Sequence, residues 1–377
     1  MKVAIVKETF PGERRVALVP ADVAKLTKNG LGVVLEPGAG LAAGLTDAAY
    51  LQKGAELASS REAALGAEII AQIRCSKPRG APIVIGMCDP LGEPQAAADL
   101  ATSGATLFAL ELIPRTTRAQ AMDVLSSMAT LAGYRAVLLA ALELPKIFPL
   151  MMTAAGTLTA ARVLILGVGV AGLSAIATAK RLGAVVRAYD VRPACREQVE
   201  SLGAKFVELP LDTAKAEGAG GYAQAQDEAF YQRQRELLGN VVAENDVVIT
   251  TAAIPGKQSP LLVIAEAVAK MQPGSVIVDL AAERGGNCAL TKADQRVNAH
   301  GVTILGPTNL ASEVPLHASQ MFSANVTAFL LNLVKKGELI LNLEDPIIRD
   351  TLLARGGQLV NPRIRDLLGM PKLETAL

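Results

Sequence analysis

Short, continuous apolar runs alternate with helix-like stretches along the chain. The first third contains five such runs, at 3–6, 32–35, 68–73, 83–87 and 106–112. They are continuous rather than alternating, which is typical of parallel strands covered on both faces. The pattern therefore predicts a parallel sheet in the N-terminal region.

Helix signals separate these runs. The segment 20–29 opens with Pro20 and stops at Gly30, the usual asymmetry between the two ends of a helix. The segment 47–53 follows Thr46, a residue type that favours the N-cap position. We expect both segments to be helices that connect strands.

Two long apolar helices are expected further along the chain. One lies within 126–149 and ends near Pro145, and the other runs from Pro315 to Val334. Between them, six more apolar runs are separated by helix-like stretches, at 162–166, 185–189, 205–208, 246–250, 275–279 and 302–305. Six strands with intervening helices suit a doubly wound sheet.

These elements predict an α/β fold with two Rossmann-like, doubly wound parallel-sheet domains joined by long helices. The return of the chain through the helix after Pro315 predicts a discontinuous first domain, 1–125 plus 314–377. The second domain, 126–313, would bind a dinucleotide.

Composition excludes several classes of protein. Of the 377 residues, 51% are hydrophobic and 19% charged, which excludes intrinsic disorder. A net charge of +1 and only 3% aromatic residues argue against nucleic-acid binding. Two His and four Cys without C-x-x-C spacing predict no metal site. The longest apolar run, 163–179, is short for a span of about 20 residues, so we expect a cytoplasmic protein.

The most informative motif is G-V-G-V-A-G at 167–172, with a predicted strand before it and a predicted helix after it. In G-x-G-x-x-G the glycines allow a tight turn, approach of a pyrophosphate and close helix packing. The N–H groups at the start of the helix can bind phosphate. Asp190 ends the next predicted strand, 18 residues after Gly172, where an acid binds the adenosine ribose. The context predicts dinucleotide binding.

Asp190 favours NAD(H) over NADP(H), because its charge would repel a 2′-phosphate. Arg192 leaves alternatives open: it could attract a 2′-phosphate, or contact the adenine side or the pyrophosphate. The candidate binding residues here are Gly167, Val168, Gly169, Val170, Gly172, Asp190, Val191 and Arg192.

One connection has no hydrophobic periodicity. Residues 211–226 are rich in Ala, Gly and polar types, and a polar helix is expected over 227–238. Loops of that length are usually functional or mobile.

The segment 164–193 resembles the fingerprint shared by alanine dehydrogenases and proton-translocating nicotinamide nucleotide transhydrogenases. V-K-E at 6–8, followed by G-E-R-R-V-A at 12–17, resembles the first signature of the same pair. The resemblance covers nearly the whole chain, so individual residues must separate the two families.

Alanine dehydrogenases carry a catalytic Lys after the fourth predicted strand and a catalytic His after the fifth. The corresponding positions here are Ser76 and Asp89, with Lys77 close by. Without the Lys and the His, no evident group would hold pyruvate and shuttle protons. This departure favours the transhydrogenases.

The stretch P-R-T-T-R-A-Q-A-M-D-V-L-S-S at 114–127 closely resembles the transhydrogenase loop that holds the nicotinamide end. G-G-Y-A at 220–223 resembles the mobile loop of that family, whose Tyr, here Tyr222, closes over the nucleotide and would exclude water. Three further segments fit the same family: 131–136, 251–257 and 285–288.

The resemblance implies direct hydride transfer from NADH to NADP⁺ held on a partner subunit, which needs two rings in an ordered, dry site. It gives Gln120 a contact toward the partner's nucleotide, and Arg115, Asp123 and Ser126 the nicotinamide and its ribose. From the residues alone, Asp123 and Ser126 could cap a helix, and Arg115 and Gln120 could be solvated surface groups. The implied catalytic set is Gln120, Arg115, Asp123, Ser126 and Tyr222, and further cofactor contacts are expected from Arg115, Arg118, Ser126, Gln234 and Ala253.

The resemblance also implies partners. Proton translocation would require a separate membrane-embedded subunit and an NADP(H)-binding subunit, with this chain as a homodimer on the cytoplasmic face of the bacterial inner membrane. Two alternatives stay open: an alanine-dehydrogenase-like oxidoreductase and a non-catalytic NAD-binding module.

Overall fold

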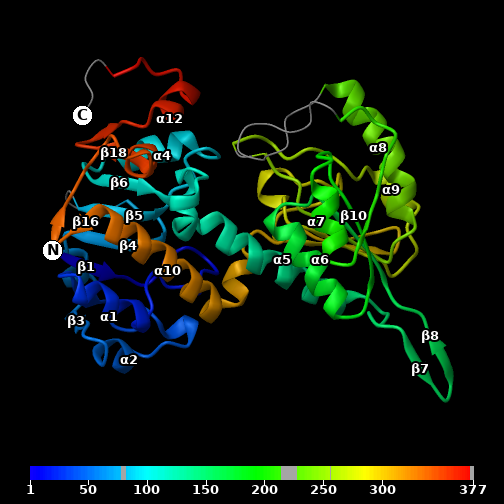
Figure 1. The fold of residues 1–377 in the computed structure, drawn as a ribbon, viewed down its shortest axis with the longest axis horizontal. Helices are drawn as coiled ribbons and strands as arrows, with labels where there is room; N and C mark the ends of the chain where they lie inside the picture. The colour runs from blue at the N-terminus through cyan, green and yellow to red at the C-terminus, as the bar shows by residue number, and fades with distance from the viewer. Residues whose placement is uncertain (78–81, 214–226, 255, 374–377) are drawn as a thin grey trace. The chain divides into compact units, whose positions relative to one another are not determined.

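The computed structural model describes residues 1–77, 82–213, 227–254 and 256–373, and the chain forms two compact units (Figure 1). Unit 1 comprises Met1–Met128 and Ala311–Leu377, and unit 2 comprises Ala129–Leu310. Each unit contains one large, mainly parallel sheet with helices packed against it. The predicted α/β class is confirmed.

The sheet of unit 1 has eight strands in the order β19-β18-β6-β5-β4-β1-β2-β3, and only β18 and β19 run antiparallel. Its strands are β1 (Lys2–Ile5), β2 (Gly32–Leu35), β3 (Glu56–Leu57), β4 (Ile69–Arg74), β5 (Ile83–Met87), β6 (Thr106–Ala109), β18 (Leu352–Arg355) and β19 (Gln358–Leu359). Its helices are α1 (Pro20–Lys28), α2 (Asp47–Leu51), α3 (Arg61–Leu65), α4 (Pro94–Ala101), α10 (Pro315–Leu333), α11 (Pro346–Thr351) and α12 (Pro362–Leu367), with a small hairpin of β16 (Val334–Lys335) and β17 (Glu338–Leu339).

Hydroxyl groups beside and within α10 explain why the chain returns to unit 1. The backbone N–H groups of Val16 and Val19 donate to the hydroxyls of Ser319 and Ser323, each at 2.9 Å. This segment is buried but pairs with no strand, so the serines supply the acceptors that its buried N–H groups need. The signature at 12–17 therefore leads into a segment that is anchored by residues 300 positions later in the chain.

The sheet of unit 2 has seven strands in the order β11-β10-β9-β12-β13-β15-β14, and only β14 runs antiparallel. Its strands are β9 (Arg162–Leu166), β10 (Val185–Tyr189), β11 (Lys205–Phe206), β12 (Val247–Thr250), β13 (Val276–Asp279), β14 (Arg296–Ala299) and β15 (Val302–Leu305), with helices α6 (Val170–Arg181), α7 (Cys195–Ser201), α8 (Glu228–Ala243) and α9 (Ala265–Ala269). Without β14, this is the strand order of a dinucleotide-binding sheet, with a switch point between β9 and β12.

The predicted elements differ from the structure in a few places. The strand expected over 106–112 ends at Ala109 and continues as a 3-10 turn, Leu110–Leu112, which turns the carboxylate of Glu111 inward to accept the N–H of Asp89. The antiparallel edge strands β14, β18 and β19 had no counterpart in the prediction. They are short and lie at sheet edges, where hydrophobic patterning is weak.

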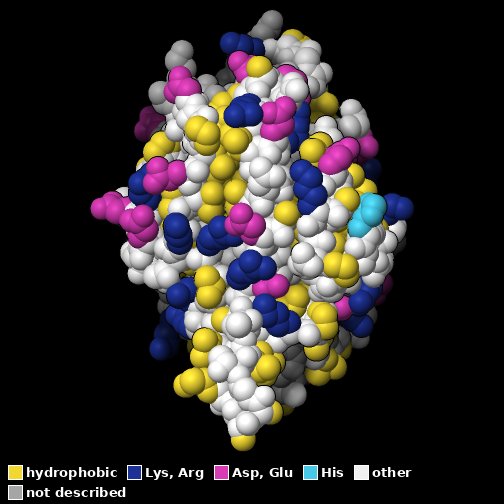
Figure 2. All heavy atoms as spheres, turned by 90° about the vertical axis from the view of Figure 1, so that its right-hand side faces the viewer, with side chains coloured by type: hydrophobic (Ala, Val, Ile, Leu, Met, Phe, Trp, Pro, Cys, Tyr) yellow, Lys and Arg dark blue, Asp and Glu magenta, His cyan; other side chains and the backbone are white. Residues whose placement is uncertain are grey.

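Helix α5 (Val124–Glu143) is apolar on all sides. By length and composition it is the one helix among the described residues that could cross a membrane, and a third of its most apolar window is buried. The hairpin of β7 (Met151–Thr153) and β8 (Gly156–Leu158) extends away from the sheet of unit 2 (Figure 1). Both strands of this hairpin are exposed, and Figure 2 shows hydrophobic side chains at the end of the molecule where it projects.

Candidate functional site

The glycine-rich loop joins β9 to α6 and is tightly packed on one side. A Cβ on Gly172 would lie 2.0 Å from the carbonyl oxygen of Gly167. Gly167 has a φ of +98°, and a Cβ there would lie 2.8 Å from the amide nitrogen of Ala252. Side chains are therefore excluded at both positions, as the fingerprint requires.

Gly169, in contrast, faces open space: a Cβ there would meet no atom within 4 Å. Gly169 is also the N-cap residue of α6, and no side chain caps this end of the helix. The first N–H groups of a helix have no partner within it and attract anions. The loop therefore leaves space and donors together, which fits the pyrophosphate of a dinucleotide.

Helix α5 packs closely on the start of α6. A Cβ on Gly133 would lie 2.0 Å from the carbonyl oxygen of Ala171, and the hydroxyl of Ser174 donates to the carbonyl oxygen of Thr130 at 2.7 Å. This contact explains the glycine in the segment 131–136. It fixes the helix that begins at the phosphate-binding loop.

Asp190 directly follows β10, and only 9% of the residue is exposed. One carboxylate oxygen accepts the N–H of Val168 at 2.7 Å and the Nη2 of Arg192 at 2.8 Å. The other accepts the backbone N–H of Arg192 at 2.9 Å and its Nε at 2.8 Å. The fold thus joins the predicted acid to the glycine loop and pairs it with the predicted cation.

Asp279 is a structural residue that the sequence did not single out. It ends β13, is fully buried, and accepts hydrogen bonds from the N–H groups of Asn287 and Cys288 at 2.8 and 3.0 Å. The hydroxyls of Thr250 and Thr291 donate to it at 2.8 and 2.7 Å. Several donors to one buried carboxylate fix the loops at this edge of the sheet.

Asn287 carries this order to the loop that contains Ala253. Its amide accepts the N–H of Ala252 at 3.0 Å and donates to the carbonyl oxygens of Ala252 and Pro260, both at 2.8 Å. Ala253 itself is exposed. The segments 251–257 and 285–288 are thus coupled through Asn287, although Pro255 lies outside the described residues.

Gln234 lies in α8 and is only 1% exposed. Its amide donates to the hydroxyl of Tyr189 at 2.9 Å, while its buried Oε1 has no hydrogen-bond partner among the described residues. Burial raises the pKa of Tyr189 to about 12, so the phenol stays protonated. The structure places Gln234 beneath the end of β10, where it supports the residue that precedes Asp190.

In unit 1, Arg115 and Gln120 are exposed on the loop before α5. Asp123 lies just before this helix, and its carboxylate accepts the N–H of Ser126 at 2.9 Å and the Ser126 hydroxyl at 2.6 Å. Asp123 therefore caps α5, as one of the two interpretations proposed. Ser126 is half-buried and held by this cap.

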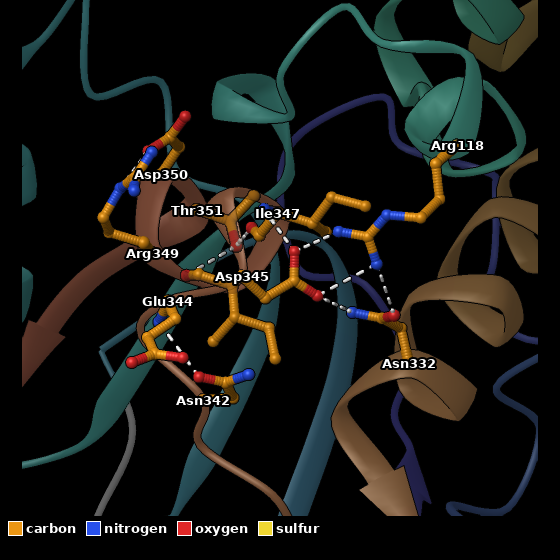
Figure 3. A network of polar contacts seen from close by, with 10 residues as sticks. Arg118, Asn332, Asn342, Glu344, Asp345, Ile347, Arg349, Asp350 and Thr351 are labelled. Carbon is orange, nitrogen blue, oxygen red and sulfur yellow. Dashed lines mark hydrogen bonds and ion pairs between the residues drawn. The ribbon is translucent and has the colours of Figure 1, made fainter.

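Arg118 lies on the same loop but points to Asp345 and Asn332 (Figure 3). Its guanidinium forms a bidentate ion pair with Asp345, and Nη1 donates to the amide oxygen of Asn332 at 3.3 Å. This pairing lowers the pKa of Asp345 to about 2. Asp345 also accepts the N–H of Ile347 at 3.0 Å at the start of α11, so Arg118 ties the loop to that helix.

The positions that separate the two families are occupied by other contacts. Ser76 and Gln72 exchange two hydrogen bonds, of 2.9 and 3.2 Å. Lys77 donates to the hydroxyl of Thr102 at 3.2 Å in an exposed contact. Asp89 has a φ of +48°, and its N–H donates to Glu111 at 2.6 Å. As far as the structure describes them, the ends of β4 and β5 therefore carry neither a buried Lys nor a His.

Two predictions fall elsewhere. Tyr222 lies outside the described residues. Within the described ranges, no group of three or more His, Cys, Asp and Glu side chains is arranged to hold a metal ion. Unit 2 also has an open groove of about 850 Å³, lined by 144–149 and Arg181, Leu182 and Gly183 among others. It lies at the C-terminal end of α6, opposite the glycine loop.

Comparisons with known proteins agree with this geometry. Two family models match, alanine dehydrogenase/PNT N-terminal domain over residues 4–132 and C-terminal domain over 136–362. An NAD(P) transhydrogenase subunit alpha of Rhodospirillum rubrum is 46% identical over 384 residues, which cover 97% of this chain and 99% of that protein. The crystal structure of transhydrogenase from Sinorhizobium meliloti has a TM-score of 0.84 and 42% identity, covering 96% of this chain and 100% of the other.

The alanine dehydrogenase of Bacillus subtilis is more distant, with 28% identity over 389 residues that cover 97% of this chain and 95% of that protein. Both domain models match, and the two transhydrogenase relatives match over nearly the full length of each chain. The chain therefore belongs to the alanine dehydrogenase/PNT family and, within it, to the group of NAD(P) transhydrogenase alpha subunits.

Proposed function

We propose that this chain is the NAD(H)-binding subunit of a proton-translocating transhydrogenase, and that it supports direct hydride transfer between NADH and NADP⁺ held on a partner subunit. The observation that carries the proposal is the glycine loop, open only at Gly169 and joined to Asp190, in a chain whose relatives are named NAD(P) transhydrogenase subunit alpha. Bound NADH supplies the hydride.

The chain's own residues would bind and orient. The N–H groups at the start of α6 hold the pyrophosphate beside Gly169, and Asp190 accepts the adenosine ribose hydroxyls. Arg115 and Ser126 hold the carboxamide side, while Asp123 fixes Ser126 through the contacts described above. Such a step is accelerated by orientation and exclusion of water, and requires no proton shuttle.

Gln120 is proposed to act in the transfer step rather than in binding, because it is exposed on its loop and free of any role in capping α5. Tyr222 is proposed to close over the nucleotide. These roles distinguish an enzyme from a non-catalytic NAD-binding module. Gln120→Asn should then slow hydride transfer at least about tenfold with an unchanged Kd for NADH, whereas equal losses in both would give Gln120 a binding role only.

An alanine dehydrogenase activity is the second candidate, supported by the distant relative of that name. It would require groups that hold pyruvate and move protons at the ends of β4 and β5. Ser76, Asp89 and Lys77 are instead engaged with Gln72, Glu111 and Thr102. These contacts favour the transhydrogenase.

The test is NADH oxidation by the purified chain under three conditions: alone with NADP⁺, with NADP⁺ and a transhydrogenase NADP(H)-binding subunit, and with pyruvate plus ammonium. The proposal expects turnover only in the second condition. Turnover with pyruvate and ammonium would identify an alanine dehydrogenase, and tight NADH binding without turnover would identify a binding module.

We further propose that the chain is a homodimer that docks on a membrane-embedded subunit at the cytoplasmic face of the bacterial inner membrane. The dimer proposal is supported by the exposed apolar side chains of the β7–β8 hairpin, among them Met151, Met152 and Leu158, at 44%, 79% and 49% exposure. A second copy would cover them. Met152→Lys should weaken the dimer in sedimentation velocity, and an unchanged dimer would remove the hairpin from the interface.

A further inference from the structure

The acceptor sites of Asp190 are filled by the protein itself. A carboxylate offers about four lone-pair sites. In this structure the backbone N–H groups of Val168 and Arg192 take one site on each oxygen, at 2.7 and 2.9 Å. The guanidinium of Arg192 takes a second site on each oxygen, through Nε and Nη2, both at 2.8 Å.

The two kinds of donor differ in what they can yield. The backbone donors belong to the glycine loop and to the turn after β10, so they move only if the loop moves. The side chain of Arg192 can rotate away, and it lies two residues after Asp190 at the edge of the sheet. It is 15% exposed and the Asp190 side chain 6% exposed, so the pair is well shielded from water.

A ribose diol needs two adjacent acceptors. The two that remain after the backbone bonds are those that the guanidinium occupies. We propose that Arg192 is an internal competitor of the adenosine ribose: dinucleotide binding exchanges the guanidinium fork for two hydroxyl donors. The inference rests on the proposed role of Asp190 in binding the ribose.

The consequence is a weaker and faster-exchanging site. A bidentate, charge-assisted pair is stronger than two hydrogen bonds from neutral hydroxyls, so its displacement lowers the net affinity for NAD(H). A subunit that must release its oxidised nucleotide after every transfer gains from this. If Arg192 instead binds the pyrophosphate or the adenine directly, it raises affinity, so the two roles predict opposite signs.

The experiment compares Arg192→Gln, Arg192→Lys and Asp190→Asn with the parent chain. The Kd for NADH is measured by fluorescence titration and the dissociation rate by stopped flow, with ADP-ribose and its 2′-deoxyadenosine analogue as matched ligands. Arg192→Gln should bind NADH and ADP-ribose about fivefold more tightly, mainly through slower dissociation. The gain should shrink for the 2′-deoxy analogue, which lacks one of the competing hydroxyls. Arg192→Lys, which keeps the charge without the fork, should fall between, and it preserves the test if the Gln variant folds poorly.

Two results would overturn the inference. Weaker or equal NADH binding by Arg192→Gln, while Asp190→Asn binds at least about tenfold more weakly than the parent, would show that Arg192 does not compete, and would leave the proposed function intact. Unchanged NADH binding by Asp190→Asn would instead remove Asp190 from the site, and the role proposed for it would fail together with the inference.

Discussion

The carboxyl-terminal edges of the two sheets are built alike and finished differently. In both units, parallel strands diverge from a switch point where α/β proteins commonly bind ligands. In unit 2 this edge carries a loop with open space at Gly169 and rigid support from Asp279. In unit 1 it is filled by the protein's own groups. Glu13 and Arg15 form a buried ion pair, and Glu8 accepts the N–H of Ile73 at 2.7 Å.

This contrast indicates that a switch point offers a site only where the protein leaves acceptors, donors and space unfilled. Burial raises the pKa of Glu8 and of Glu111 to about 7, so both carboxyl groups are poorly compensated when charged. Asp279 is equally buried but accepts several hydrogen bonds, which stabilise its charge. One edge is organised around a stable anion, and the other around carboxyls that titrate.

The largest expected effect separates two glycines of the open edge. Gly172→Ala should lower the unfolding free energy by about 3 kcal/mol, because its methyl would overlap the carbonyl of Gly167. Gly169→Ala should leave stability within about 0.5 kcal/mol but weaken NADH binding at least about tenfold, because its methyl enters the space left for pyrophosphate. Chemical denaturation and NADH titration of both variants check this. Unchanged NADH affinity in Gly169→Ala would place the pyrophosphate elsewhere.

A second pair of variants compares the two kinds of buried carboxyl. Asp279→Asn should lower the unfolding free energy by about 3 kcal/mol at pH 8, because several donors lose a charged acceptor. Glu8→Gln should leave it equal or higher at that pH, because it removes a carboxylate that is costly to charge. Urea denaturation at pH 8 measures both. Similar losses in the two variants would contradict the contrast between the edges.

The closed edge also predicts a pH dependence of stability. The pKa values of Glu8 and Glu111 rise from 4.5 to about 7 on folding, so between these pH values the folded state holds protons that the unfolded chain has released. The unfolding free energy should therefore fall as pH rises from 4.5 to about 7, and then level off. Asp345, with its pKa lowered to about 2, contributes only below this window. The double variant Glu8→Gln, Glu111→Gln should show a shallower slope, and an identical slope would refute the assignment.

The smallest effect is expected at Arg118. Because its guanidinium is paired with Asp345, Arg118→Ala should change the Kd for NADH less than about twofold. Isothermal titration of this variant, with Arg115→Ala as its neighbour on the same loop, measures the difference. A loss as large as that of Arg115→Ala would show that Arg118 leaves Asp345 to contact the nucleotide.

The sequence was informative where local rules decide the structure. Continuous apolar runs located most of the parallel strands, β9, β10 and β15 with their full bounds, and Thr46 caps α2 as expected. The glycine fingerprint located the loop because each glycine has a steric reason that composition cannot hide. Such features depend on residues close together in the chain.

The remaining features depend on contacts that no local pattern encodes. Arg118 pairs with a residue 227 positions away, and the donors to Asp279 come from separate loops. Gln234, expected to contact the cofactor, is buried under Tyr189 because α8 packs on the end of β10. Arg192 was ambiguous in the sequence, since a side chain that can reach several anions is placed only by the rotamer that packing selects.

Direct hydride transfer is tested by following the transferred hydrogen itself. NADH deuterated at the transferring C4 position is mixed with the chain, NADP⁺ and a transhydrogenase NADP(H)-binding subunit in ordinary water, and the NADPH formed is examined by mass spectrometry. Direct transfer without a proton-shuttling residue predicts deuterium in essentially every NADPH molecule. NADPH that carries hydrogen from the solvent would contradict direct transfer, because it would require an exchanging group on the protein.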